Sequence, residues 1–189
     1  MEKRVIIAGS GGQGVLFFGK LLAYAAMIEG REVTCFPSYG AEMRGGTANC
    51  TVIISDCMIG SPVIRNPDVL VVMNEASYKR FLEKLLPGGV LVYDSSLIHS
   101  EIPRDDISVV KTPACGIASS LNCVQSANMA MIGAFIAATR ILDIDSVLRA
   151  IDEITPPHRR DLLAVNKAII LKGYGNGHLA SAASEETVG

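Results

Sequence analysis

The hydrophobic residues of this chain follow two patterns, short β-branched runs and longer stretches with apolar residues at helical spacing. The two patterns alternate through the first part of the chain, and the C-terminal part shows mainly the helical one. Strands that alternate with helices predict an α/β domain with a largely parallel or mixed sheet flanked by helices. The expected strands are residues 4–8, 32–36, 48–54, 69–73, 90–93 and 107–110, and the expected helices are 15–28, 76–86, 114–121, 127–140, 144–154 and 159–173.

These elements predict a single three-layer domain over residues 1–173 with a helical C-terminal part. The 189 residues suffice for one sizeable core, since single cores grow to about 250 residues before chains divide into domains. No internal repeat or linker interrupts the chain. Residues 174–189 turn to Gly, Ser, Ala and Glu, which cannot build a core, so we expect a loose C-terminal tail.

The composition indicates a subunit rather than an isolated protein. Hydrophobic residues make up 49% of the chain and charged residues only 19%, so some apolar surface is expected to meet a partner. The same surface would allow the isolated chain to form a homodimer. The net charge of −2 gives no positive field, which argues against nucleic acid as a partner.

The chain carries no pattern typical of a secreted or membrane protein. The segment before the first glycine is too short for the apolar core of a signal peptide, and we expect a cytoplasmic location. The most apolar helical stretch, about residues 126–142, falls short of the ~20 apolar residues that cross a bilayer. It is expected to be a buried helix, and no membrane partner is expected.

Metal-binding and catalytic patterns are not visible. The five cysteines include no C-x-x-C pair, and we expect them to be small buried hydrophobes. The three histidines lack metal-site spacing, and no residue is assigned to catalysis. Asp94-Ser95-Ser96 closes an expected strand where α/β sheets bind ligands, but a turn built from Asp and Ser explains it as well.

A glycine-rich loop joins the first expected strand to the first helix. Gly9, Gly11 and Gly14 fit the spacing G-x-G-x-x-G, with Gly12 and Gln13 between them. Free backbone N–H groups and the helix dipole at this position favour an anion. The amide of Gln13 can donate and accept hydrogen bonds at once, which suits a ligand or the backbone of a partner.

The loop does not match the common nucleotide fingerprints completely. A dinucleotide site needs an acid at the end of the second strand, but that strand ends Cys35-Phe36-Pro37, which disfavours NAD. No G-K-[ST] follows the glycines, so the loop is not a Walker motif. Two interpretations stay open: the glycines bind an anion or a partner, or they only let strand and helix pack closely.

A second glycine-rich loop, residues 37–46, joins the second and third expected strands. Its arginine could hold a carboxylate or phosphate through two parallel hydrogen bonds, as a 2-oxoacid or a coenzyme requires. Its acid could orient the arginine, or the two could form a surface ion pair worth little. The candidate residues are Ser38, Tyr39, Gly40, Glu42, Arg44, Gly45 and Gly46.

Together these motifs resemble the gamma subunit of 2-oxoacid:ferredoxin oxidoreductases over about residues 4–173. The resemblance is nearest to the gamma subunit of the 2-oxoglutarate (2-ketoglutarate) enzymes. It rests on the two loops, Gly9 to Val15 and Pro37 to Cys50, and on Ser61-Pro62, Pro67-Asp68-Val69-Leu70, Pro87-Gly88-Gly89, Tyr93-Asp94-Ser95-Ser96 and Ala127-Asn128-Met129.

The resemblance implies an enzyme that decarboxylates a 2-oxoacid on thiamine diphosphate, passes electrons through iron-sulfur clusters to ferredoxin and transfers the acyl group reversibly to coenzyme A (CoA). The chain has no G-D-G thiamine-diphosphate motif and no cluster-binding cysteine run. Thiamine diphosphate, Mg and the clusters would therefore belong to alpha and beta subunits and to a ferredoxin-like delta subunit where one exists. This chain alone would bind no cofactor, and it would be inactive without its partners.

The resemblance also suggests a role for the two loops on the CoA side of the complex. We hypothesise that the N–H groups of Gly11 to Gly14 and the side chain of Arg44 face the CoA phosphates or a partner's loop, with Glu42 orienting Arg44. Two alternatives remain, a stand-alone nucleotide- or coenzyme-binding module and a purely structural assembly protein.

Overall fold

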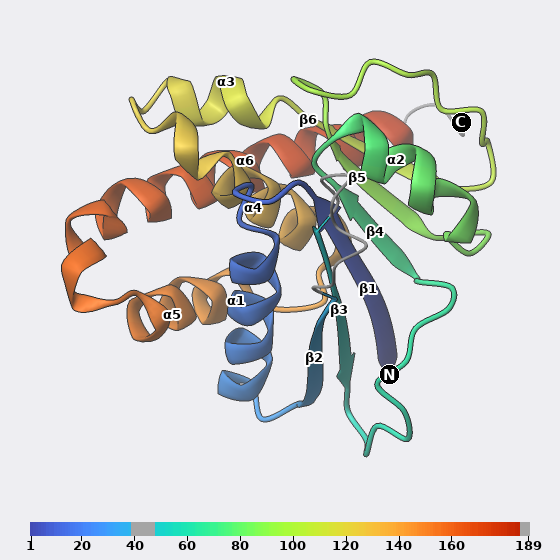
Figure 1. The fold of residues 1–189 in the computed structure, drawn as a ribbon, viewed down its shortest axis with the longest axis horizontal. Helices are drawn as coiled ribbons and strands as arrows, with labels where there is room; N and C mark the ends of the chain where they lie inside the picture. Colours follow the sequence, from blue (N-terminus) through green and yellow to red (C-terminus); the bar gives the residue numbers. More distant parts are fainter. Residues whose placement is uncertain (39–47, 186–189) are drawn as a thin grey trace.

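The computed structural model describes residues 1–38 and 48–185, and the side chains of the last helix as far as Gly177. In this part of the chain a six-stranded mixed sheet has the order β2-β3-β1-β4-β5-β6 (Figure 1). The expected α/β fold with a mixed sheet, flanking helices and a helical C-terminal part is confirmed. The strands are β1 (Glu2–Gly9), β2 (Glu32–Ser38), β3 (Ala48–Ser55), β4 (Val69–Val72), β5 (Val90–Asp94) and β6 (Ser108–Thr112).

The helices cover both faces of the sheet, with α1, α4, α5 and α6 on one side and α2 on the other (Figure 1). Short 3₁₀ segments extend three of them at Leu82–Lys84, Val124–Ser126 and Pro157–Leu162. The helices are α1 (Val15–Ile28), α2 (Glu75–Phe81), α3 (Ala114–Ser119), α4 (Ala127–Thr139), α5 (Ile144–Ile154) and α6 (Leu163–Glu185).

Strand direction decides which loops meet. β4 runs parallel to β1, β5 to β4 and β6 to β5, whereas β3 is antiparallel to both β1 and β2. The carboxyl ends of β1, β2, β4, β5 and β6 therefore share one edge of the sheet. Gly9 of β1 is the register partner of Ala48 at the start of β3, so β3 begins at this same edge.

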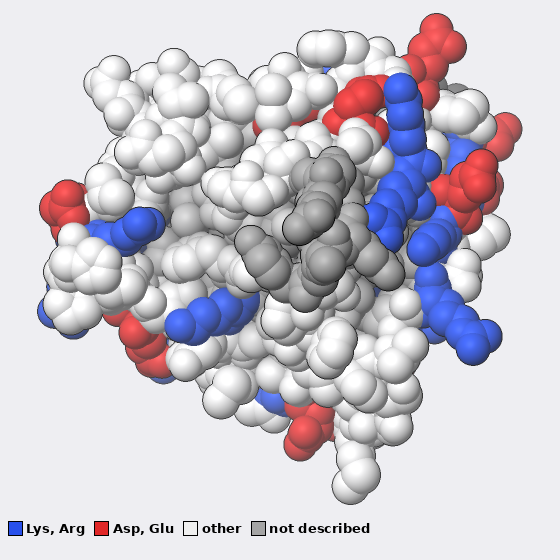
Figure 2. Space-filling view, viewed as in Figure 1, with Lys and Arg blue, Asp and Glu red and all other residues white. Residues whose placement is uncertain are grey.

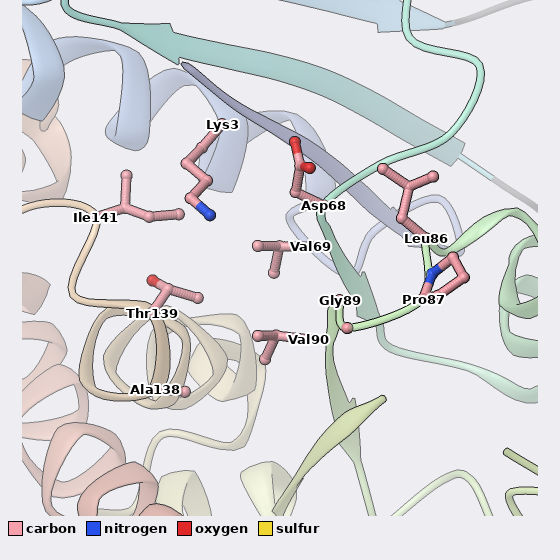
Figure 3. Close-up of a pocket in the computed structure, with 11 residues that line it drawn as sticks. Lys3, Asp68, Val69, Leu86, Pro87, Gly89, Val90, Ala138, Thr139 and Ile141 are labelled. Atoms are coloured by element: carbon pink, nitrogen blue, oxygen red, sulfur yellow. The ribbon is translucent and has the colours of Figure 1, made fainter. Parts of the chain in front are cut away.

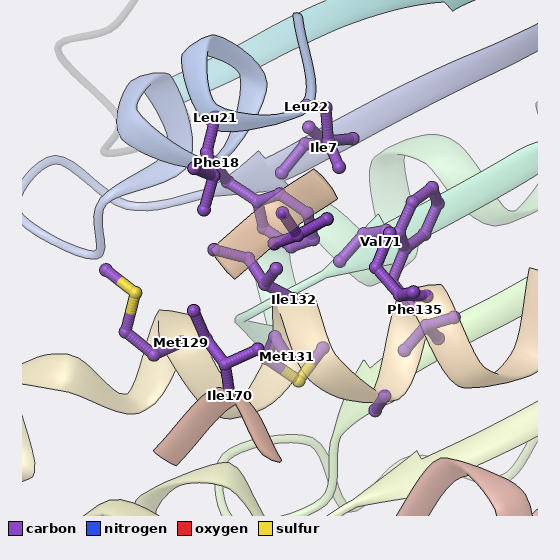
Figure 4. Packing of buried hydrophobic residues seen from close by; sticks show 14 of the residues in the cluster. Ile7, Phe18, Leu21, Leu22, Val71, Met129, Met131, Ile132, Phe135 and Ile170 are labelled. Atoms are coloured by element: carbon purple, nitrogen blue, oxygen red, sulfur yellow. The ribbon is translucent and has the colours of Figure 1, made fainter. Parts of the chain in front are cut away.

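Alternating side chains of the strands feed two cores. Ile7 of β1 joins the larger core under α1 and α4, whereas Ile6 joins the smaller core under α2. In the larger core Phe18 of α1 meets Phe135 of α4 edge to face, with ring centroids 5.8 Å apart (Figure 4). The central strands are buried on both faces, which explains their nearly continuous aliphatic sequences.

The C-terminal segment corrects one expectation. The last helix does not end at residue 173 with a loose tail beyond it but continues to Glu185. Its glycines allow α6 to lie directly on α4: a Cβ on Gly177 would sit 2.7 Å from the carbonyl oxygen of Ala134. A Cβ on Gly133 of α4 would sit 2.6 Å from the backbone nitrogen of Tyr174. Of the small residues that suggested a tail, Gly177 is therefore a contact point between α6 and α4.

The cysteines correct a second expectation, that all five of them are buried. Cys50 and Cys123 are buried as expected, but Cys35 and Cys57 are exposed and Cys115 is half-buried. Cys35 lies on β2, which has a neighbouring strand on one side only, and Cys57 lies in the turn after β3. Within residues 1–38 and 48–185, no helix combines the length and apolar character needed to span a membrane.

Candidate functional site

A cavity of about 200 Å³ opens at the carboxyl edge of the sheet, where α/β sheets usually bind their ligands. It lies between the first glycine loop, the ends of β4 and β5, and the starts of α3 and α4. Its lining residues are Gly12, Gln13, Met73, Asp94, Leu97, Cys115, Val124, Gln125, Ala127 and Asn128.

The first glycine loop needs glycine for conformation and for space. Gly12 and Gly14 have φ angles of 89° and 75°, in the left-handed region that other residues rarely adopt. A Cβ on Gly9 would lie 3.3 Å from Cβ of Met73, and one on Gly14 would lie 2.8 Å from Cγ of Asn128. Close packing thus explains Gly9 and Gly14, while a Cβ on Gly11 would meet no atom within 4 Å.

The amide of Gln13 holds this loop in place. Its Oε1 accepts a 2.6 Å hydrogen bond from the backbone N–H of Ser10, and its Nε2 donates a 2.8 Å bond to the carbonyl oxygen of Met73. Asn74 adds a 2.5 Å bond from its Nδ2 to Oγ of Ser10. The loop is therefore fastened to the end of β4 before any ligand arrives, and Gln13 has a structural role.

The carboxylate of Asp94 stabilises the carboxyl edge of the sheet at the end of β5. It is only 2% exposed, and its Oδ1 accepts bonds from the backbone N–H groups of Ser96 (2.9 Å) and Ala114 (3.2 Å). Its Oδ2 lies 3.6 Å from Sγ of Cys115. The carboxylate thereby joins the end of β5 to the start of α3.

The thiol of Cys115 faces the cavity but is not activated. Burial raises its pKa above the usual value, and the negative charge of Asp94 raises it further. A thiol with a raised pKa stays protonated at neutral pH and is a poor nucleophile.

Asn128 is the polar side chain best placed to contact a ligand. It lies in the first turn of α4, is only 7% exposed and lines the cavity. Its side-chain amide has no hydrogen-bond partner among the residues that the structure describes. Next to it, the N-termini of α1 and α4 meet where Gly14 touches Asn128, and both helix dipoles favour an anion there.

Asn128 and Cys115 were not predicted as site residues. For Asn128 the sequence contained two signals, an amide in the first turn of an otherwise apolar helix and its place in the motif Ala127-Asn128-Met129, on which the resemblance partly rests. Its proximity to the glycine loop depends on the packing of α1 against α4.

The second glycine loop begins and ends at the same edge. Ser38 closes β2, half-buried, and its register partner is Asn49 of β3. The chain thus leaves and re-enters the sheet beside the first loop, because Ala48 pairs with Gly9. The other candidates of this loop, Tyr39, Gly40, Glu42, Arg44, Gly45 and Gly46, lie outside the described residues.

A second cavity, of about 180 Å³, lies at the opposite edge of the sheet (Figure 3). Lys3, Asp68 and Val90 line it together with the end of α4. It lies at the amino ends of the parallel strands, away from both glycine loops. Among the described side chains, those of residues 1–38 and 48–177, no group of three or more His, Cys, Asp or Glu could hold a metal ion. The cavity at the carboxyl edge is therefore the candidate site.

The fold and this edge define a class of protein, a three-layer α/β domain with a glycine loop beside a cavity at the carboxyl ends of its strands. The chain belongs to the pyruvate ferredoxin/flavodoxin oxidoreductase family, whose model matches residues 4–175. The resemblance to the gamma subunit of 2-oxoacid:ferredoxin oxidoreductases, drawn from the motifs, is confirmed.

Two proteins with similar sequences support this assignment. The 2-oxoglutarate synthase subunit KorC of Methanocaldococcus jannaschii is 33% identical over 172 residues, which cover 88% of this chain and 92% of that protein. The ketoisovalerate oxidoreductase subunit VorA of Methanothermobacter thermautotrophicus is 42% identical over 136 residues, 72% of this chain. That match spans only 28% of VorA.

The fold recurs in a solved structure. The gamma subunit of keto/oxoacid ferredoxin oxidoreductase from Geobacter sulfurreducens superimposes with a TM-score of 0.85. The two are 24% identical, and the match covers 95% of this chain and 98% of that one. At this identity the likeness shows a shared fold.

Proposed function

We propose that this chain is the gamma subunit of a 2-oxoacid:ferredoxin oxidoreductase that acts on 2-oxoglutarate. The complex would convert the 2-oxoacid, CoA and oxidised ferredoxin reversibly to acyl-CoA, CO₂ and reduced ferredoxin. The observation that carries the choice of substrate is length: three KorC relatives align with this chain nearly end to end, with 92–99% of their length matched, whereas a fourth is matched over 53%. Subunits named for pyruvate and ketoisovalerate are also relatives, so substrate choice needs a direct assay.

The proposal divides the work among subunits. Thiamine diphosphate, Mg and the iron-sulfur clusters would be held by alpha, beta and, where present, delta subunits, and ferredoxin would accept the electrons. The complex would operate in the cytoplasm.

Exposed apolar side chains supply a surface for those partners. Much of the face shown in Figure 2 carries no charge, and charged side chains gather mainly toward its margins. Met27, Phe36, Met58 and Val63 are each more than half exposed. Burying such residues favours association, because apolar area removed from water contributes about 25 cal/mol per Å².

This chain would contribute the carboxyl-edge cavity to the CoA side of the complex. The phosphates of CoA would lie against the N–H groups of Gly11, Gly12 and Gly14 and the N-termini of α1 and α4. The backbone N–H of Gln13 is not available for this, because it donates a 3.1 Å hydrogen bond to the carbonyl oxygen of Ser10. Arg44 would add a charged contact from the second loop, with Glu42 orienting it. Asn128 would donate from its free amide, and Gln13 and Asp94 would keep the edge in shape.

Replacing Asn128 by Asp in the assembled complex tests this role. The carboxylate has nearly the same size but would repel a phosphate and cannot donate, so we expect the KM for CoA to rise about tenfold, or roughly 1.4 kcal/mol. The KM for the 2-oxoacid should not change. Asn66→Asp is the matched control, because Asn66 is exposed and lies outside the cavity.

Arg44→Ala extends the test to the second loop and should also raise the KM for CoA. An assembled complex in which both Asn128→Asp and Arg44→Ala keep the wild-type dependence on CoA would remove the proposed role. Tight NAD binding by the isolated chain would instead favour a stand-alone nucleotide-binding module.

A further inference from the structure

Two cysteine thiols lie in contact on neighbouring strands, away from the cavity. Sγ of Cys35 on β2 is 3.5 Å from Sγ of Cys50 on β3. The register pairs Cys35 with Val52 and Pro37 with Cys50, so the cysteines are diagonal neighbours on one face of the sheet. Side chains two positions apart along a strand share a face, which explains why the thiols converge.

The two thiols differ in their access to solvent. Cys35 is exposed, because β2 is an edge strand, whereas Cys50 is fully buried. Helix α1 covers Cys50 at Gly19, where a Cβ would collide with the Cys50 sulfur and lie 3.4 Å from that of Cys35. A small oxidant in solvent would therefore meet Cys35 first, and Cys50 is placed to react with Cys35.

The pKa values of the two thiols also differ, and the difference favours reaction at Cys35. The hydrogen bond between the two thiols lowers the pKa of Cys35 below its ordinary value, although burial opposes this. The same hydrogen bond, with burial, raises the pKa of Cys50. These directions agree with the exposure of Cys35 in making it the first of the two thiols to react.

We propose that Cys35 and Cys50 form a redox-active dithiol that a low-molecular-weight disulfide oxidises to an intrachain disulfide. The Cys35 thiolate attacks one sulfur of the oxidant and releases its first thiol. The Cys50 thiol then loses its proton to solvent and attacks Sγ of Cys35, which releases the second thiol. Two protein thiols are oxidised, and one external disulfide is reduced to two thiols.

The reaction requires the sulfurs to approach from 3.5 Å to the disulfide length of about 2.05 Å. Diagonal neighbours on adjacent strands have Cα atoms about 7–8 Å apart, near the upper limit that a disulfide spans, so β2 must also shift toward β3. As an outermost strand, β2 is bonded to a neighbouring strand on one side only. The new bond would tie β2 to β3 near the carboxyl edge, on either side of residues 39–47.

Oxidised glutathione added to the reduced, full-length chain provides the test. Trypsin cuts after Arg31, Arg44 and Arg65, so it separates Cys35 from Cys50. The oxidised chain should give a linked pair of peptides, residues 32–44 with residues 45–65, under non-reducing conditions. Thiols titrated in denaturant should fall from the five cysteines of the sequence to three, and dithiothreitol should restore them.

Variants identify the partner, because the second peptide also contains Cys57. Cys57→Ser should keep the linked peptides, and Cys35→Ser should abolish them while its circular dichroism stays that of the wild type. Glutathione retained on Cys35, a dimer joined through Cys35, or a bond from Cys35 to Cys57 in place of Cys50 would each overturn the proposal.

Discussion

At the residue scale, two polar side chains of the candidate site form hydrogen bonds to the backbone of the same chain. Gln13 and Asp94 use their polar atoms to fix the first glycine loop and the start of α3. The side-chain amide of Asn128, by contrast, has no partner in the described part of the chain. The cavity is thus largely preformed, so little binding free energy would be needed to order these residues around a ligand.

Replacing Gly19 by Ala tests the contact between α1 and the sheet. The new Cβ would collide with the sulfur of Cys50, a buried atom with little room to move, so we expect a loss of about 1–3 kcal/mol in the free energy of unfolding. Gly116→Ala in α3 is the control, since its Cβ would meet no atom within 4 Å. Denaturant unfolding measures both, and equal effects of the two substitutions would contradict the packing described here.

The ion pair between Arg4 and Asp68 makes stability depend on pH. Partial burial alone would raise the pKa of Asp68, but side-chain and backbone hydrogen bonds from Arg4 outweigh it and hold the pKa below its usual value. A carboxyl with a lowered pKa stabilises the fold above the unfolded value of about 3.9. That contribution is lost as the pH falls through the folded-state pKa.

Asp68→Asn should therefore cost about 1 kcal/mol at pH 7, a modest value because the pair is partly exposed. It should also weaken the loss of stability on acidification. Asp106→Asn, which removes the more exposed partner of Arg104, should cost less. Urea unfolding at several pH values gives the comparison. Parallel pH profiles for the wild type and Asp68→Asn would refute the assignment.

At the element scale, the sequence was most informative where polar or special residues interrupt an apolar pattern. Helices α1 and α5 begin and end as expected, because Gly14 precedes one and Thr155-Pro156 follows the other. The third and fourth strands were readable from β-branched runs. The length of α6 could not be predicted, because the role of Gly173 and Gly177 is evident only from their close approach to the backbone of α4.

The packing of α4 on α6 leads to a prediction at this scale. A Cβ on Gly133 would clash with the carbonyl oxygen of Ile170, and backbone cannot yield as a side chain can. We expect Gly133→Ala to destabilise the fold by about 3 kcal/mol, the upper part of the range for overpacking. Gly175→Ala in α6, whose Cβ would meet no atom within 4 Å, should be neutral or stabilising. Thermal unfolding of both variants tests this; a stable Gly133→Ala variant would contradict it.

At the scale of the whole molecule, segments that are separate in the sequence lie together at the carboxyl ends of the strands. Both glycine loops were recognised from their composition, and strand directions place their ends side by side. The position of Asn128 in the cavity beside the first glycine loop could not be predicted from the sequence, because it depends on how α1 packs against α4. Likewise, Cys35 is exposed because β2 is an outermost strand of the sheet, with a neighbouring strand on one side only.

The central claim is that this chain works as the gamma subunit of a 2-oxoglutarate:ferredoxin oxidoreductase. The most direct measurement is anaerobic purification of the tagged chain, at native expression level, from its own cells. The eluate is assayed for thiamine diphosphate, iron and CoA-dependent reduction of ferredoxin with 2-oxoglutarate, pyruvate or 2-oxoisovalerate. We predict co-purification of companion subunits with both cofactors and the highest activity with 2-oxoglutarate. A chain that elutes alone and without cofactors would contradict the subunit assignment, and a complex active on another 2-oxoacid but not on 2-oxoglutarate would contradict the substrate.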